Sequence, residues 1–119
     1  MSAIPKTYIS PSQYLDTEAE STIRHEYING EMYAMAGATP DHIQITLNVP
    51  LALAAHLYAK GYDIYTTEMR VKLVPTGAYF YPDVVIVCGG KEMDAQTLIN
   101  PTVIIEILSD STANYDRGG

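Results

Sequence analysis

The chain has 119 residues, of which 47% are hydrophobic and 18% are charged, a composition typical of one globular domain rather than of a disordered segment. Seven basic against fourteen acidic residues give a net charge of −7, which argues against a protein that coats nucleic acid non-specifically but allows a site where carboxylates gather around cations. Cys88 is the single cysteine, so a disulfide framework and a multi-thiolate zinc site are excluded, and its apolar neighbours predict a buried side chain.

The first third of the chain predicts a short helix followed by a β-hairpin. Ser10-Pro11-Ser12 marks the start of the helix, with Tyr14 and Leu15 on its apolar side. Asn29-Gly30 predicts the tight turn of the hairpin, because both turn residues must accept positive φ.

A longer helix is predicted next, beginning at Thr39-Pro40-Asp41 and ending at Gly61. The interior Pro50 should kink it. Spacings of three and four predict one buried stripe made of Ile43, Leu47, Leu51, Ala54 and Leu57 or Tyr58.

The second half of the chain predicts a sheet. Alternation in "YDIYTTEMRVKLV", residues 62–74, predicts one long strand that is half buried and half polar. The segments "YFYPDVVIVCGG" and "PTVIIEILS" predict two further strands that are central and covered on both faces. Residues 109–119 resemble the start of a second helix. We therefore expect a single α/β (α+β) domain over residues 1–119.

Two carboxylates in this sheet point to chemistry. Asp83 opens an apolar strand and Glu106 lies inside the next one, where an unpaired charge costs several kcal/mol. If the strands are neighbours, both carboxylates can share one side of the sheet and repel each other unless a cation or a proton lies between them. Mg²⁺ or Mn²⁺ suits such an all-oxygen site.

Structural explanations exist for both residues. An acidic residue at the start of a strand is often a solvated turn residue, which would explain Asp83. A salt bridge from Glu106 to Arg70 or Lys72 would explain the second carboxylate without a metal.

Three segments together resemble the Uma-type putative restriction endonuclease family, of the PD-(D/E)XK nuclease superfamily. They are "HEYINGEMYAMAGATPDHIQI", "YPDVVIVCGG" and "NPTVIIEILSDSTANYDRGG", and the resemblance runs from about Tyr14 to Gly119. It implies a restriction-endonuclease-like mixed sheet flanked by helices and preceded by a β-hairpin. The core order would be helix-strand-strand-strand-helix-strand.

The resemblance also implies roles for individual residues. Asp83 would be the aspartate of the PD motif and Glu106 the acidic ligand of the (D/E)XK motif, and the carbonyl of Ile107 would add a further metal ligand. Glu31 and His42 fall where the family tends to keep a glutamate and a histidine, and they are carried over as second-tier site residues. His42 could equally be a polar residue in the first turn of a helix.

Two departures from the family pattern are visible. Leu108 occupies the position where the superfamily keeps a catalytic lysine, and this family moves that lysine to a helix just after a stretch resembling "YDRGG". The chain stops at Gly119, so we expect that it lacks the C-terminal helix and strand of the full core.

These observations lead to two functional hypotheses. The first is a Mg²⁺- or Mn²⁺-dependent DNA endonuclease, or a truncated remnant of one, that hydrolyses a phosphodiester with a metal-activated water. The alternative is a catalytically inactive nuclease-fold domain that binds DNA or protein or oligomerises. In either case we expect homo-oligomers formed through exposed apolar surface and no small-molecule cofactor.

The sequence also carries an expectation about location. No apolar run approaches the roughly 20 residues needed to cross a bilayer, and the N-terminus lacks the basic start and apolar block of a signal peptide. We therefore expect a cytoplasmic protein that does not enter a membrane.

Overall fold

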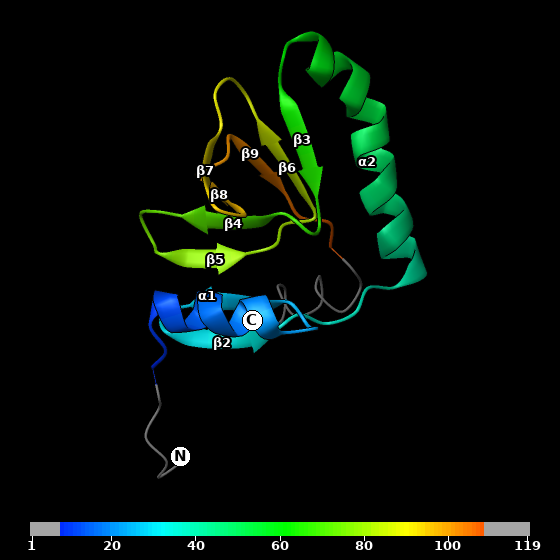
Figure 1. Ribbon diagram of the computed structural model, residues 1–119. Helices are drawn as coiled ribbons and strands as arrows, with labels where there is room; N and C mark the ends of the chain where they lie inside the picture. The colour runs from blue at the N-terminus through cyan, green and yellow to red at the C-terminus, as the bar shows by residue number, and fades with distance from the viewer. Residues whose placement is uncertain (1–7, 109–119) are drawn as a thin grey trace.

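The computed structural model describes residues 8–108, which form two helices and nine strands, and the strands make up two sheets (Figure 1). The first sheet has six strands in the order β2-β1-β5-β4-β8-β7, and the second has three strands in the order β3-β6-β9. The elements are α1 (Pro11–Glu20), β1 (His25–Ile28), β2 (Glu31–Ala34), α2 (Pro40–Ala59), β3 (Asp63–Thr66), β4 (Arg70–Leu73), β5 (Ala78–Phe80), β6 (Val84–Val87), β7 (Glu92–Asp94), β8 (Thr97–Ile99) and β9 (Val103–Ile105).

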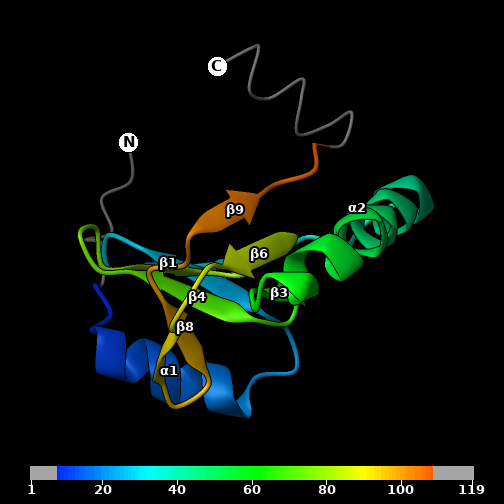
Figure 2. The same ribbon diagram turned by 90° about the horizontal axis from the view of Figure 1, so that it is seen from above.

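The predicted helix and hairpin at the N-terminal end are confirmed. Ser10 caps α1 through a capping box with Gln13, which satisfies two backbone donors at the helix start. The turn between β1 and β2 has Asn29 at φ 51° and Gly30 at φ 81°, the positive values that this tight turn requires. Helix α1 packs on β1, and Figure 2 shows it on the opposite side of the strands from β9.

The predicted long helix is also confirmed, and it forms α2. The side chain of Thr39 accepts the N–H of His42 at the start of the helix, which continues through Pro50 to Ala59. Figure 1 shows α2 running beside β3, and the helix packs against β3 and β6.

The predicted buried stripe of α2 is wrong. Ile43, Leu47, Leu51 and Tyr58 are between 52% and 67% exposed, whereas Thr46 on the sheet side is buried. Because α2 is apolar on most of its circumference, the spacing of its apolar residues could not identify the side that packs on the sheet.

The prediction of one strand over residues 62–74 is wrong as well. The N–H of Met69 donates to the carbonyl of Thr66, and the turn at Thr67-Glu68 moves the chain from β3 in the three-stranded sheet to β4 in the six-stranded one. The same transfer happens in reverse at Tyr81-Pro82-Asp83, between β5 and β6. Pro82 has no N–H to donate to a ladder, which suits a break between strands.

The burial of the sheet differs in part from the expectation. The segment 79–90, predicted as one strand, forms parts of two, β5 and β6, in different sheets. Strand β6 is central and buried along its length, as predicted, but β9 is at the edge of its sheet within residues 8–108 and is partly exposed. Cys88 is exposed, because it lies just beyond the end of β6. The β7–β8 hairpin was not predicted, and the expected second helix lies outside the described residues.

The α/β (α+β) fold class is confirmed. Helix α2 and the strands of the three-stranded sheet, taken in chain order as β3, β6 and β9, follow the helix-strand-strand-strand order that the family resemblance implies, with β4, β5, β7 and β8 of the other sheet between them. The main core cluster contains Val71, Val85, Val87 and Leu98. Over residues 8–108, neither helix is long and apolar enough to cross a membrane.

Candidate active site

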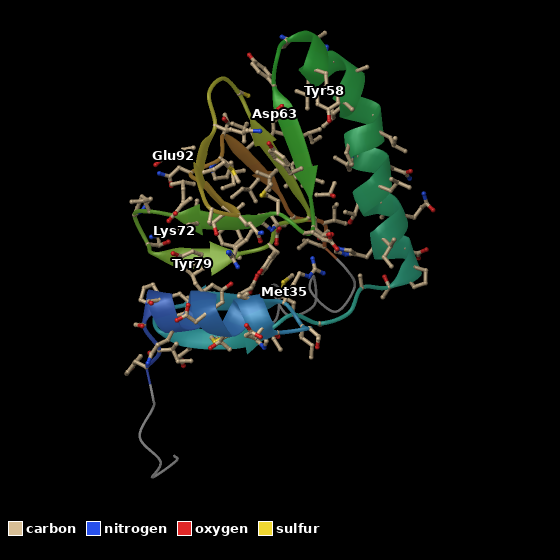
Figure 3. All side chains as sticks on the ribbon, in the orientation of Figure 1. Met35, Tyr58, Asp63, Lys72, Tyr79 and Glu92 are labelled. Carbon is tan, nitrogen blue, oxygen red and sulfur yellow. The ribbon has the colours of Figure 1, made fainter. Side chains whose placement is uncertain are left out.

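A pocket of about 550 Å³ lies where the chain passes between the two sheets. Both transfer points contribute to it, through Thr67 after β3 and through Tyr81 and Asp83 before β6. The remaining walls come from β1, the start of α2, the segment after β9 and the link after β2, where Met35 is labelled in Figure 3. Its polar and charged lining residues are Arg24, Glu26, Thr39, His42, Thr46, Thr67, Tyr81, Asp83 and Glu106.

Asp83 and Glu106 are brought together by strand pairing. Strands β6 and β9 are antiparallel, with Val84 opposite Ile105. One step beyond this pair, Asp83 faces Glu106 at the end of the ladder, and both line the pocket. The sequence analysis left open whether the two strands are neighbours, and the structure shows that they pair and that the two carboxylates are opposite each other.

Backbone hydrogen bonds orient both carboxylates. The N–H of Asp83 donates to Oε1 of Glu106 at 3.1 Å, and the N–H of Ile107 donates to Oδ2 of Asp83 at 2.7 Å. Each carboxylate is therefore held by the backbone of the opposite strand. Ile107, a predicted ligand through its carbonyl, is seen here as a hydrogen-bond donor to Asp83 and as part of the pocket lining.

His42 completes the contact with Asp83. Its Nε2 lies 3.0 Å from Oδ1 of Asp83, and both side chains are largely buried. The histidine occupies the first turn of α2, where the positive end of the helix dipole favours a nearby anion. The family-derived choice of His42 therefore falls inside the pocket.

The electrostatics of the pocket disfavour an ionised Glu106. Much of this residue is exposed, because it follows an edge strand, but partial burial of its carboxyl in the pocket raises its pKa. The negative charges of Asp83 and Glu26 raise this pKa further, while the N–H of Asp83 and the side chain of His42 oppose the rise. A bound cation would remove the repulsion that drives part of this shift.

Glu26 is a pocket residue that the sequence did not single out. It lies on β1 and lines the pocket, and burial raises the pKa of its carboxyl. In the sequence Glu26 is one polar position in a hairpin strand, and only the fold, which brings it into the same pocket as Asp83 and Glu106, indicates a role.

Glu31, the other second-tier residue, lies elsewhere. It begins β2 beyond the hairpin turn, where the hydroxyl of Tyr33 donates to its carboxylate at 3.1 Å, and it is absent from the pocket lining within residues 8–108. Glu31 directly follows the turn at one end of the hairpin, whereas the hairpin residues that line the pocket, Glu26 among them, lie toward the other end.

The segment between β5 and β6 that leads to Asp83 is held in place by Glu18, a buried carboxylate on α1. Glu18 accepts a hydrogen bond from the hydroxyl of Tyr81 at 2.7 Å and another from the N–H of His25 at 2.8 Å, and its other oxygen lies 3.0 Å from Nδ1 of His25. Burial, together with the bond to Glu18, raises the pKa of Tyr81. Through these bonds, Glu18 links α1 to His25 on β1 and to Tyr81, which lies two residues before Asp83.

The salt bridge considered for Glu106 is not found among the described residues. Nε of Arg70 donates to Oγ1 of Thr97 at 2.8 Å, and Nζ of Lys72 lies 5.3 Å from the ring centre of Tyr79. Figure 3 labels Lys72 and Tyr79 on the adjacent strands β4 and β5. These strands belong to the other sheet, which keeps both cations away from the carboxylate pair.

The donor set of the pocket suits a hard divalent cation. Within residues 8–108 no three potential ligands among His, Cys, Asp and Glu converge as a metal cluster. Mg²⁺ nevertheless needs only one or two carboxylates, because it retains water molecules and uses substrate phosphate oxygens. Asp83 and Glu106 are therefore sufficient as protein ligands, and they fit this ion.

Comparisons with known proteins place the chain among nuclease-related sequences. The sequence model of Uma2, described as a putative restriction endonuclease, matches residues 11–119. Two relatives from Synechocystis sp. (strain ATCC 27184 / PCC 6803 / Kazusa) carry the names "Uncharacterized protein slr1290" and "Uncharacterized protein sll1609". The first is 33% identical over 97% of this chain, and the second is 30% identical over 92%.

One solved structure is similar in fold. It is a crystal structure of a putative nuclease belonging to DUF820 from Anabaena variabilis ATCC 29413, with a TM-score of 0.72 at 16% identity, and the match covers 92% of this chain and 64% of that one. The present chain spans 61% and 63% of the lengths of the two Synechocystis relatives.

Proposed function

We propose that this chain, which belongs to the Uma2 family of putative restriction endonucleases, acts as a metal-dependent DNA endonuclease. The reaction would be hydrolysis of a phosphodiester bond, with DNA as the partner and Mg²⁺ or Mn²⁺ as the ion. A cytoplasmic location and self-association belong to the same proposal.

The pairing of Asp83 with Glu106 is the observation that carries this proposal. Two carboxylates that face each other across an antiparallel ladder repel, and no basic side chain forms an ion pair with Glu106 in the described part of the chain. Such an arrangement is costly in the empty protein and becomes favourable when a cation binds.

Each polar residue of the pocket would have a separate role in the reaction. Asp83 and Glu106 would hold the ion, and His42 would keep the Asp83 carboxylate in place through the contact at Oδ1. Arg24 lines the same pocket, and its guanidinium can attract the phosphate backbone. When bound, the metal would lower the pKa of a water molecule and neutralise charge on the phosphate.

Cleavage of supercoiled plasmid DNA tests the proposal. The 119-residue chain and the full product of its reading frame should be compared with Glu106→Ala, each with Mg²⁺ and with Mn²⁺. We expect metal-dependent nicking that Glu106→Ala abolishes. An inert full product, together with a Glu106→Ala variant whose metal affinity equals that of the wild type, would show that the assignment is wrong.

A nuclease-fold domain without catalysis is the second candidate. The position of Leu108 favours it, since this residue lines the pocket where the wider superfamily keeps lysine, and no lysine lines the pocket within residues 8–108. DNA binding or self-association without metal-dependent nicking, in the chain and in the full product alike, would support this candidate.

A further inference from the structure

Three polar or charged residues are buried in the part of the chain that the structure describes, and only one of them lacks a hydrogen-bond partner there. Glu18 accepts a hydrogen bond from the hydroxyl of Tyr81. Oγ1 of Thr97 accepts one from Nε of Arg70. Thr46 is 7% exposed, and its Oγ1 is buried without a partner. A buried hydroxyl without a hydrogen bond destabilises the folded chain, so its presence in this position calls for an explanation.

Thr46 lies in the wall of the candidate active site. It is one helical turn beyond His42 on the same side of α2, and both residues line the pocket. Threonine in a helix has two accessible χ1 rotamers. A change of rotamer redirects the hydroxyl without moving the backbone, and the pocket is the open space beside this side chain.

The pocket offers many hydrogen-bond acceptors and few donors. Glu26, Asp83 and Glu106 contribute carboxylates, which accept hydrogen bonds when ionised. Among the described residues, Arg24 is the only lysine or arginine in the lining, and its Nη1 donates to the carbonyl of Thr67. The non-bridging oxygens of a DNA phosphate only accept hydrogen bonds. A phosphate that enters this pocket therefore needs donors besides Arg24.

We propose that the hydroxyl of Thr46 donates a hydrogen bond to a non-bridging oxygen of the DNA phosphate that enters the pocket. The inference rests on the proposed nuclease function and adds a substrate-binding residue to it. Threonine hydroxyls commonly donate to phosphate oxygens. The bond would supply a partner for a hydroxyl that has none in the free protein. Thr46 therefore contributes to substrate binding and not to the stability of the fold.

Replacement by valine separates a binding role from a structural role, because valine matches threonine in shape and lacks the hydroxyl. Thr46→Val removes a buried polar group that has no partner, so the urea midpoint should stay the same or rise. Thr97→Val is the matched control. Thr97 is buried outside the pocket lining and accepts a bond from Arg70, so this variant should lower the urea midpoint and leave DNA affinity unchanged.

Fluorescence anisotropy of a labelled DNA duplex measures substrate binding by the 119-residue chain, with Ca²⁺ as a hard ion that also binds oxygen ligands. Thr46→Val should weaken DNA binding about tenfold, because a hydrogen bond to a charged group is lost. Thr46→Ser keeps a hydroxyl and should bind DNA within about threefold of the wild type. Calorimetric titration with Mg²⁺ alone should give the same affinity for Thr46→Val and the wild type, since the hydroxyl contacts phosphate and not the metal.

Three results would overturn the inference. They are a Thr46→Val variant that binds DNA as tightly as the wild type, a loss of DNA affinity accompanied by a lower urea midpoint, and a parallel loss of Mg²⁺ affinity. Each of them leaves the nuclease assignment in place if the wild type nicks plasmid DNA and Glu106→Ala does not. A wild type without nicking that depends on Glu106 would instead reject the proposed function, and the role of Thr46 with it.

Discussion

Asp83 and Glu106 face each other at the end of the β6–β9 ladder, and the N–H of Asp83 donates to Oε1 of Glu106 at 3.1 Å. The N–H of Ile107 returns a bond to Oδ2 of Asp83 at 2.7 Å. These bonds fix the direction of both carboxylates but do not remove the repulsion between them, since peptide groups carry no net charge. This repulsion is the basis of our proposal that the pair binds a cation.

The contact between His42 and Asp83 should matter for activity. His42→Ala removes the group 3.0 Å from Oδ1 of Asp83, and loss of such an orienting partner typically lowers metal affinity or activity about 10- to 100-fold. His56→Ala is the matched control, because His56 is exposed in the last turn of the same helix. Equal rates of plasmid nicking for both variants would contradict this role.

Glu26 should make stability fall as pH rises. Burial raises the pKa of its carboxyl above the ordinary value of 4.5, so the folded chain binds its proton more tightly than the unfolded chain does. The contribution of protonated Glu26 to the free energy of unfolding is complete below pH 4.5, and it is lost as pH rises through the pKa that Glu26 has in the folded chain. Glu26→Gln should therefore gain stability relative to the wild type as pH rises above 4.5.

Urea unfolding across this pH range measures the effect of Glu26→Gln. Glu92→Gln is a suitable control, because Glu92 lies on the fully exposed strand β7. A difference between Glu26→Gln and the wild type that stays constant with pH would show that the Glu26 carboxyl is not perturbed by burial.

Metal binding should also depend on pH. Burial, followed by repulsion from Asp83 and Glu26, raises the pKa of Glu106, so protons compete with a metal at higher pH than they would at an ordinary glutamate. Mg²⁺ affinity should fall as pH is lowered from neutral toward the ordinary glutamate pKa of 4.5, and calorimetry at a series of pH values measures it. An affinity that stays constant down to this ordinary pKa would argue against Glu106 as a ligand.

The bond between Tyr81 and Glu18 should contribute to stability. Tyr81→Phe removes a buried donor and leaves Glu18 with one bond fewer, which should cost about 1–3 kcal/mol. Tyr33→Phe removes an exposed bond to Glu31 and should cost much less. Urea denaturation compares the two, and similar losses would show that burial of the Glu18 cluster adds nothing.

Local signals predicted the parts of the fold that depend on backbone chemistry. Asn29-Gly30 fixed the hairpin because few residue pairs accept its φ values, and Thr39-Pro40 fixed the start of α2 because a cap and a proline both favour that point. The sequence also identified Asp83 and Glu106 as candidate site residues, because a carboxylate among apolar strand residues costs free energy unless it has a partner.

Features that depend on long-range packing could not be predicted. The alternation of residues 62–74 continues across the turn at Thr67-Glu68, so the pattern gives no sign that β3 and β4 belong to different sheets. Glu26 lines the same pocket as Asp83 and Glu106 although it lies 57 positions before Asp83 in the sequence, and no local pattern signals that proximity. The sequence could not predict which side of α2 packs on the sheet, because apolar residues occur on both sides of the helix.

The central claim is that Asp83 and Glu106 together bind a divalent cation. Calorimetric titration of Mg²⁺ into the wild type, Asp83→Asn, Glu106→Gln and the control Glu92→Gln at about pH 8 tests it most directly. The account predicts that both pocket variants lose at least about tenfold in affinity, which corresponds to about 1.4 kcal/mol, while Glu92→Gln binds like the wild type. If Asp83→Asn and Glu106→Gln bind Mg²⁺ as tightly as the wild type, the carboxylate pair is not a metal site.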